Sequence, residues 1–171
     1  MTPFLLSQLI AGGSFVCDLI AFFLPRRVAT LRLLALSTCL LAVHFALLDQ
    51  KSASVMMLLA SLRYLIATWS TNRKIVGFFC LTALFCSVLT WRNVIDLLPL
   101  AGSLLMTLAA FKQDEVKLRL YTLAGSLFWL TNNLLCHSPV AAMMEFAFIS
   151  STLVSLYRLY RARIGIPHQL D

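Results

Sequence analysis

Long apolar runs separated by short polar breaks dominate this chain of 171 residues. Each run has roughly 16–21 residues, close to the ~20 that a helix needs to cross a hydrocarbon layer about 30 Å thick. Hydrocarbon cannot satisfy unpaired backbone groups, so each run predicts a helix, and the fold class is an all-α membrane protein with seven transmembrane helices. The expected spans are residues 3–23, 31–48, 52–70, 75–90, 94–111, 118–135 and 139–157.

The composition supports a membrane protein over a soluble one. Hydrophobic residues make up 60% of the chain, charged residues make up 12%, and the mean hydropathy is +0.87. That leaves too little polar surface to cover a soluble core. The net charge of +7 comes from Lys and Arg clusters between the apolar runs, not from one basic face, so we expect membrane lipids and no nucleic acid as partners.

The Lys and Arg residues are distributed unequally between the two sides of the predicted membrane segment. Eleven follow the first, third, fifth and seventh spans, and two follow the others. Under the positive-inside rule this predicts an outside N-terminus and a cytoplasmic C-terminus. The eleven are Arg26, Arg27, Arg32, Arg73, Lys74, Lys112, Lys117, Arg119, Arg158, Arg161 and Arg163, against Lys51 and Arg92.

The first part of the sequence resembles the last part. At an offset of 87 residues, Leu31-Arg32-Leu33 meets Leu118-Arg119-Leu120, and the pair Met56-Met57 meets Met143-Met144. A shift of two residues in the first loop also brings Gly13-Ser14 onto Gly102-Ser103. The alternative is a chance match between Leu-rich segments, but the matches include arginine, glycine and paired methionines.

A true repeat would divide the chain into 1–74, a first three-helix repeat, 75–93, a linker helix, and 94–171, a second three-helix repeat with a cytoplasmic tail. One linking helix makes the two repeats parallel, related by an axis along the membrane normal. This 3+1+3 layout with an outside N-terminus resembles the SWEET and PQ-loop (MtN3-like) superfamily of small transporters. The Pro-Gln dipeptide of that superfamily is missing, and Pro99 has no counterpart in the first span.

Several short motifs carry a closer resemblance. The pair His44-Phe45, the SLRYL segment around Arg63, LLPLAGSLLMTLAAF in the fifth span, and Arg119 are similar to the YgjV-type bacterial inner-membrane proteins. The resemblance extends over residues 9–161. It implies a multi-pass protein of the bacterial inner (plasma) membrane.

Arg63 lies near the middle of the third span, where a charge costs roughly 2.5–3.5 kcal/mol on insertion scales. Asp18 is expected at a similar depth in the first span. If the first and third helices are neighbours, as in a SWEET-like half, the two residues can form an ion pair that lowers the cost of both charges. The alternatives for Arg63 are a gate or substrate ligand, or snorkelling toward the cytoplasm.

Four further polar residues, from helices of both halves, are expected in the outer halves of their spans. These are His44, Asn132, Asn133 and Glu145. Together with Arg63 they are the candidates for a substrate pocket. His44 is equally explained by packing with one hydrogen bond, and Glu145 by either proton-coupled function or structural pairing. Adjacent positions on a helix point about 100° apart, so one of the two asparagines is expected to face inward.

We therefore expect a SWEET-like transporter or facilitator of a small polar solute, with a pocket near the midplane between the two halves. The alternative is a non-transporting membrane interaction or regulatory protein. No Gly-rich phosphate loop, HExxH or G-x-S-x-G pattern occurs, so we expect neither an enzyme nor a bound metal or cofactor. A homo-oligomer is left open.

Overall fold

The computed structural model describes residues 2–70, 72–110, 112 and 114–164, and all regular secondary structure in them is helical. Residues 165–171, the last part of the expected cytoplasmic tail, lie outside the described residues. The helices are α1 (Pro3–Phe23), α2 (Arg27–Leu47), α3 (Lys51–Ile66), α4 (Arg73–Thr90), the 3-10 turn η1 (Val94–Asp96), α5 (Leu97–Ala109), α6 (Glu115–Leu135) and α7 (Pro139–Ile164).

The seven α-helices confirm the positions expected from the apolar runs. Side chains in the polar breaks cap backbone N–H groups at the starts of some helices, as Asn72 does for α4 and Asp114 for α6. The fifth span differs, since it opens with the turn η1. Pro99 is therefore the third residue of α5, in the first turn, where no backbone N–H is needed for the helix.

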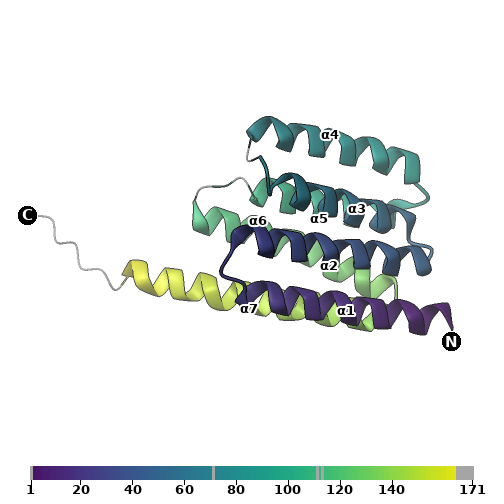
Figure 1. The fold of residues 1–171 in the computed structure, drawn as a ribbon, viewed down its shortest axis with the longest axis horizontal. Coiled ribbons are helices and arrows are strands. Elements are labelled where there is room, and N and C mark those ends of the chain that lie inside the picture. The colour runs from purple at the N-terminus through teal and green to yellow at the C-terminus, as the bar shows by residue number, and fades with distance from the viewer. Residues whose placement is uncertain (1, 71, 111, 113, 165–171) are drawn as a thin grey trace, which may run out of the picture.

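The helices run side by side along one direction in two layers (Figure 1). In the first helix set, α1–α3, α2 lies between α1 and α3; in the second helix set, α5–α7, α6 lies between α5 and α7. The sets meet where α1 packs on α7 and α3 on α5, and α4 packs on α3 and α5. The expectation that the first and third helices of a set are direct neighbours is therefore wrong, because α2 separates them.

Three of the described helices are long and apolar enough to cross a membrane, namely 3–21, 27–47 and 139–161, and 74–90 and 94–109 are shorter apolar helices. The full count of seven crossings stays a prediction. The surface fits lipid, because large apolar side chains point outward on α4. Examples are Phe78, Leu81, Phe85, Val88 and Leu89, each at least 62% exposed.

One spacing recurs between the two helix sets. α6 begins and ends 88 residues after α2, and α7 begins 88 residues after α3. The α2–α3 and α6–α7 turns have the same geometry, with a positive φ at Asp49 (57°) and at His137 (51°), again 88 residues apart. In each turn the next residue donates its N–H across the turn at 2.9 Å, from Gln50 to Phe45 and from Ser138 to Asn133.

The close contact of α1 with α2 and that of α5 with α6 are also 88 residues apart in the sequence. Ser14 of α1 bonds Ser37 of α2, with 2.8 Å between their hydroxyl oxygens. The residues 88 positions later are Gly102 and Gly125, where α5 and α6 approach so closely that an added Cβ on either glycine would lie 3.2 Å from the other's carbonyl oxygen.

The offset of 87 read from the sequence differs by one residue from the spacing of 88 between the starts of α3 and α7. At 87, Met56 would match Met143, yet Met56 is 1% exposed and Met143 is 68% exposed. At 88 it matches Met144, which is 8% exposed. Because each segment has two adjacent methionines, the sequences can be aligned at either offset. The burial of the side chains agrees only with an offset of 88.

Candidate functional site

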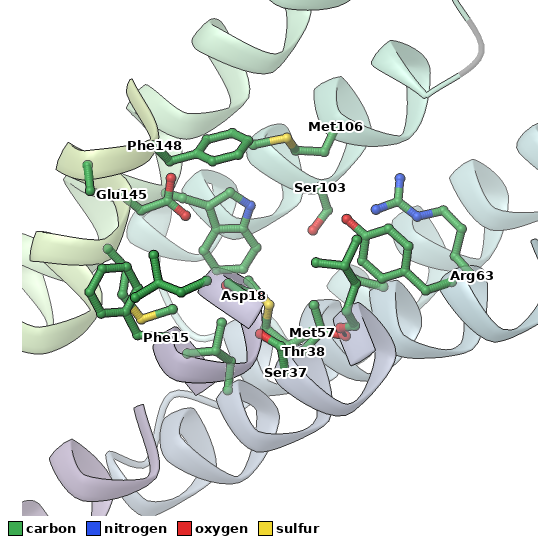
Figure 2. A pocket seen from close by; sticks show the side chains of 18 of the residues that line it. Phe15, Asp18, Ser37, Thr38, Met57, Arg63, Ser103, Met106, Glu145 and Phe148 are labelled. Atoms are coloured by element: carbon green, nitrogen blue, oxygen red, sulfur yellow. Dashed lines mark hydrogen bonds between the residues drawn. The ribbon is translucent and has the colours of Figure 1, made fainter. Parts of the chain in front are cut away.

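A cavity of about 380 Å³ lies between the two helix sets. Its lining comes from α1, α2, α3, α5, α6 and α7, and α4 contributes none of it. Most of the wall is apolar or aromatic, as in small-molecule sites generally, with a few polar groups among it (Figure 2).

Three charged residues line the cavity: Asp18 of α1, Arg63 of α3 and Glu145 of α7. Figure 2 shows Glu145 and Arg63 on opposite sides, with Asp18 between them in this view. Asp18 and Glu145 are close enough to interact electrostatically, and serine side chains are near each, Ser37 by Asp18 and Ser126 by Glu145.

Arg63 forms no ion pair with Asp18, which corrects the pair expected from the sequence. The Nη1 of Arg63 donates to Thr107 Oγ1 at 3.0 Å, and its guanidinium lies 5.2 Å from the centre of the Tyr64 ring. The direct pair fails because α2 separates α1 from α3, whereas Thr107 lies on α5, the neighbour of α3. Arg63 thus joins the first helix set to the second with a neutral partner.

Glu145 lines the cavity (Figure 2). Its Oε2 is buried and has no hydrogen-bond partner, and the same is true of the neighbouring Ser126 Oγ. No ion pair within 4.0 Å involves Glu145 or Asp18 in the part of the chain that the structure describes. Buried carboxylate oxygens are normally bonded, so Glu145 is the polar group of the cavity that most needs a partner.

His44 is fully buried, but it does not line the cavity. Its Nδ1 lies 2.8 Å from the Ser7 carbonyl oxygen and its Nε2 lies 2.9 Å from Ser138 Oγ. A carbonyl only accepts, so Nδ1 carries the proton and Nε2 accepts from the serine hydroxyl. Both ring nitrogens are therefore used in tying α1 and α2 to the α6–α7 turn.

Asn132 and Asn133 do not line the cavity either. Both are buried, at 1% and 2% exposed, so the expectation that one of the two faces inward was incomplete. Adjacent positions on a helix point about 100° apart. Both asparagines can be buried because α6 packs against two helices, α5 and α7. Asn132 Nδ2 and Asn133 Oδ1 have no hydrogen-bond partner.

Two residues of the site on α5, Ser103 and Thr107, were not predicted from the sequence. Thr107 Oγ1 donates to the Ser103 carbonyl at 2.7 Å and accepts from Arg63. The signal was present, because hydroxyl residues four apart on an otherwise apolar helix lie on one face. That face turns toward Arg63.

At the end of the molecule that carries the α2–α3 turn, hydrogen bonds join the two helix sets. Gln8 Oε1 accepts from the backbone N–H of Val140 at 3.2 Å, and Ser52 Oγ donates to the Asp96 carbonyl at 3.4 Å. His44 and Ser138 add a third link. We call this region the Asp49 end.

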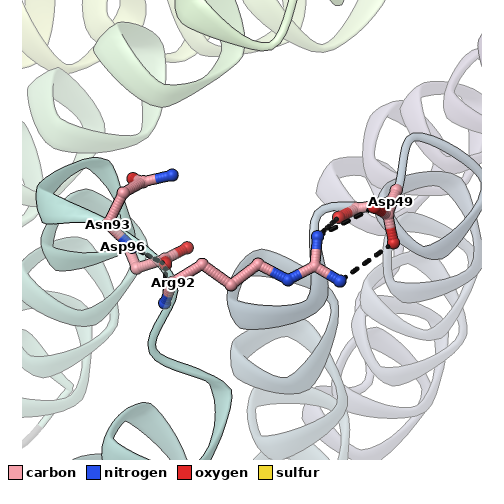
Figure 3. Close-up of polar contacts among 4 residues, drawn as sticks. All are labelled: Asp49, Arg92, Asn93 and Asp96. Carbon is pink, nitrogen blue, oxygen red and sulfur yellow. Dashed lines mark hydrogen bonds and ion pairs between the residues drawn. The ribbon is translucent and has the colours of Figure 1, made fainter.

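Arg92 and Asp49 form an exposed ion pair at the Asp49 end (Figure 3). The guanidinium is bidentate, with Nη1 2.8 Å from Oδ2 and Nη2 3.2 Å from Oδ1. Asp96 positions the loop, because its carboxylate accepts from the backbone N–H groups of Arg92 and Asn93. The hydrogen bond and the charge of Arg92 lower the pKa of Asp49, and the hydrogen bond to Asp49 raises the pKa of Arg92.

We predict that this pair contributes stability only while Asp49 is ionised. The lowered pKa of folded Asp49 means that the contribution is complete above the unfolded pKa of about 3.9 and disappears as the pH falls through the folded pKa. Asp49→Asn keeps a residue that tolerates positive φ and removes the charge. Thermal melts of the purified protein should separate wild type from Asp49→Asn at pH 7 and converge below about pH 3.9. A difference that persists at the lower pH would show that the charge is not responsible.

Comparison with known proteins gives one family and one curated relative. The family model Imp-YgjV, described as "Bacterial inner membrane protein", matches residues 5–163. The "Inner membrane protein YgjV" of Escherichia coli (strain K12) is 22% identical over 161 residues, which cover 94% of this chain and 88% of the relative. No solved structure matches the chain.

Proposed function

We propose that this chain, which belongs to the YgjV family of bacterial inner membrane proteins, is a transporter or facilitator of small polar solutes. Its site is the cavity between the two helix sets, and the observation that carries the proposal is that charged side chains from both walls face a cavity of about 380 Å³. Charges inside a membrane segment are costly and are typical of solute or ion pathways.

The location of the protein is the bacterial inner membrane, with multiple apolar helices. We further propose a 3+1+3 arrangement like that of the SWEET superfamily, in which the two helix sets are parallel repeats and α4 is the linker. The order within each set differs from a SWEET-like half, because α2 and α6 are the middle helices. The N-terminus of the chain is outside and its C-terminus cytoplasmic, in keeping with the Lys and Arg bias. The Asp49 end is then the outer end.

The constant spacing of 88 residues supports the repeat. Cavity-lining residues occur as pairs at this spacing, one from each helix set. The hydrogen bond between Gln8 and Val140 has a counterpart in the one between Asp96 and Ser52. Asp96 lies 88 residues after Gln8, and Val140 lies 88 residues after Ser52. The lining pairs are Phe15 and Ser103, Asp18 and Met106, Leu41 and Trp129, Met57 and Glu145, Ala60 and Phe148, Arg63 and Ser151.

A cavity on the axis between two related halves is what alternating access requires, because rocking of one half against the other opens either side of the same site. The bonds at the Asp49 end hold the outer ends of the helices together in this conformation. Their partners are mostly neutral, so these bonds can break and reform at modest cost. We propose that this conformation is the one closed to the outside.

Solute entry into proteoliposomes tests the proposal without prior choice of a substrate. Vesicles with the purified full chain are incubated with a mixture of small metabolites, and their contents are compared with protein-free vesicles by mass spectrometry. The matched variants are Ala60→Trp, which fills the cavity, and Leu81→Trp, on the exposed face of α4.

We expect wild type and Leu81→Trp to admit at least one solute faster than protein-free vesicles, and Ala60→Trp to admit none above that background. Equal entry through Ala60→Trp would remove the cavity from the pathway. No protein-dependent entry of any solute would favour the non-transporting alternative.

A further inference from the structure

We infer that the solute is a zwitterion with an ammonium group at one end, a carboxylate at the other and an apolar chain between them. This inference rests on the proposed function, since it names the class of solute for the same cavity. The geometry that carries it is the separation of charge across the cavity, with acidic side chains on the wall of α1 and α7 and a basic one on the wall of α3.

The acidic wall fits a cation. Asp18 and Glu145 come from the packed pair α1 and α7, they interact electrostatically, and no Lys, Arg or His lies within 4.0 Å of either among the described residues. Glu145 lines the cavity, and its buried Oε2 has no hydrogen-bond partner. An ammonium group offers up to three N–H donors and a positive charge to these oxygens.

A metal ion fits this wall less well than an organic cation. Among the described residues, no group of three or more His, Cys, Asp and Glu side chains is placed to hold a metal. Aromatic side chains line the same cavity as the two carboxylates, namely Phe15, Phe148 and Trp129. Ring faces attract organic ammonium groups, and this attraction strengthens where water is excluded.

The opposite wall fits a carboxylate. Arg63 has a fixed positive charge, and both of its recorded partners, the Thr107 hydroxyl and the Tyr64 ring, are neutral. Only one of the five guanidinium N–H donors is used by Thr107, so the planar group can still bind a carboxylate with two parallel hydrogen bonds. The hydroxyl of Ser103, on the same side of the cavity, adds a neutral donor.

The space between the walls selects the length of the solute. Apolar side chains including Leu34, Leu41 and Met57 line it, so methylene groups are favoured over hydroxyls there. Because Glu145 and Arg63 lie on opposite sides in Figure 2, we expect glycine, whose charges are adjacent, to reach only one of them. We expect an ω-amino acid with several methylenes to reach both.

A homologous series measures both the charges and their separation. The probes are glycine, β-alanine, 4-aminobutyrate, 5-aminovalerate and 6-aminohexanoate, with the alkylamines and alkylcarboxylates of equal length, and glucose as a neutral solute. Binding of each compound to the full chain in detergent is measured by calorimetry. Entry of the same compounds into proteoliposomes is measured in parallel. The variants are Glu145→Gln, Asp18→Asn and Arg63→Lys, and the control is Glu115→Gln at the exposed start of α6.

We expect one of the longer ω-amino acids to bind at least tenfold more tightly than glycine and than either single-charge analogue of its length. Glu145→Gln and Asp18→Asn should each weaken the ω-amino acid and the alkylamine but leave the alkylcarboxylate unchanged. Arg63→Lys, which retains the charge but not the planar fork, should weaken the ω-amino acid and the alkylcarboxylate only. Glu115→Gln should bind as wild type does.

Two results would overturn the inference, and they separate it from the proposed function. Entry of glucose through the cavity, with no binding of any amine, would leave transport standing and reject the zwitterion. No binding of the series and no entry of any solute would reject both. Binding of an ω-amino acid without entry would support the solute class and reject transport.

Discussion

Replacing Gly102 by alanine is expected to destabilise the protein by about 1–3 kcal/mol, the usual cost of overpacking a core. A Cβ at this position would lie 2.7 Å from Trp129 Cδ1 and 2.8 Å from Trp129 Nε1. Trp129 is 3% exposed and packs on Phe45 with 5.8 Å between ring centroids, so moving it away from the new Cβ would disturb that packing. The backbone of Gly125 blocks the other direction at 3.2 Å.

The matched control is Gly13→Ala in α1, where an added Cβ meets nothing within 4 Å. Alanine is the better helix former, so this change should stabilise by about 0.5–1 kcal/mol. Unfolding of both variants in a denaturing detergent, followed by circular dichroism, should therefore give shifts of opposite sign. Shifts of the same sign would mean that the close approach of α5 and α6 is not what requires glycine at position 102.

Replacing His44 by alanine is expected to cost at least about 3 kcal/mol, because it adds a cavity to the loss of two buried hydrogen bonds. The Ser7 carbonyl and the Ser138 hydroxyl would both lose their His44 partner in a buried site. His44 ties three chain segments together, so unfolding should begin at the Asp49 end. The readout is the same denaturing titration, with hydrogen exchange of the α6–α7 turn as a local measure.

The control for His44 is Val43→Ala, one residue earlier on α2 and 45% exposed, which should change the stability little. His44→Ala protein that folds as well as wild type would contradict the structural role. It would restore His44 as a candidate for binding solute.

The helix positions could be predicted from the sequence because they depend on local properties. An apolar run long enough to cross lipid, ended by capping residues, has one low-energy backbone, and α1 begins and ends where the run 3–23 predicted. The order of the helices within each set is not local. It depends on how ridges and small residues such as Ser14 and Gly102 fit together, which a single sequence does not reveal.

The errors about the site follow from that order. The expected pair of Asp18 and Arg63 assumed that α1 and α3 touch, and once α2 lies between them Arg63 reaches α5 instead. Depth along a helix was estimated well enough to find Arg63 and Glu145 in the cavity. It could not distinguish them from His44, which is buried at an interface where every polar atom of its ring is satisfied.

We propose that the cavity between the helix sets opens to each side of the membrane in turn. The five native cysteines are free and none is fully buried, so they can be replaced with little loss of packing. A single cysteine is then introduced by Ser103→Cys in the cavity wall, or by Leu81→Cys on the outer face of α4 as the unreactive control.

Labelling with a membrane-impermeant maleimide, in intact cells and in inverted vesicles, tests this claim most directly. We predict that the cysteine at position 103 reacts from both sides, more slowly from the side that carries the Asp49 end, and that the cysteine at position 81 reacts from neither. Reaction of the cysteine at position 103 from one side only would contradict alternating access.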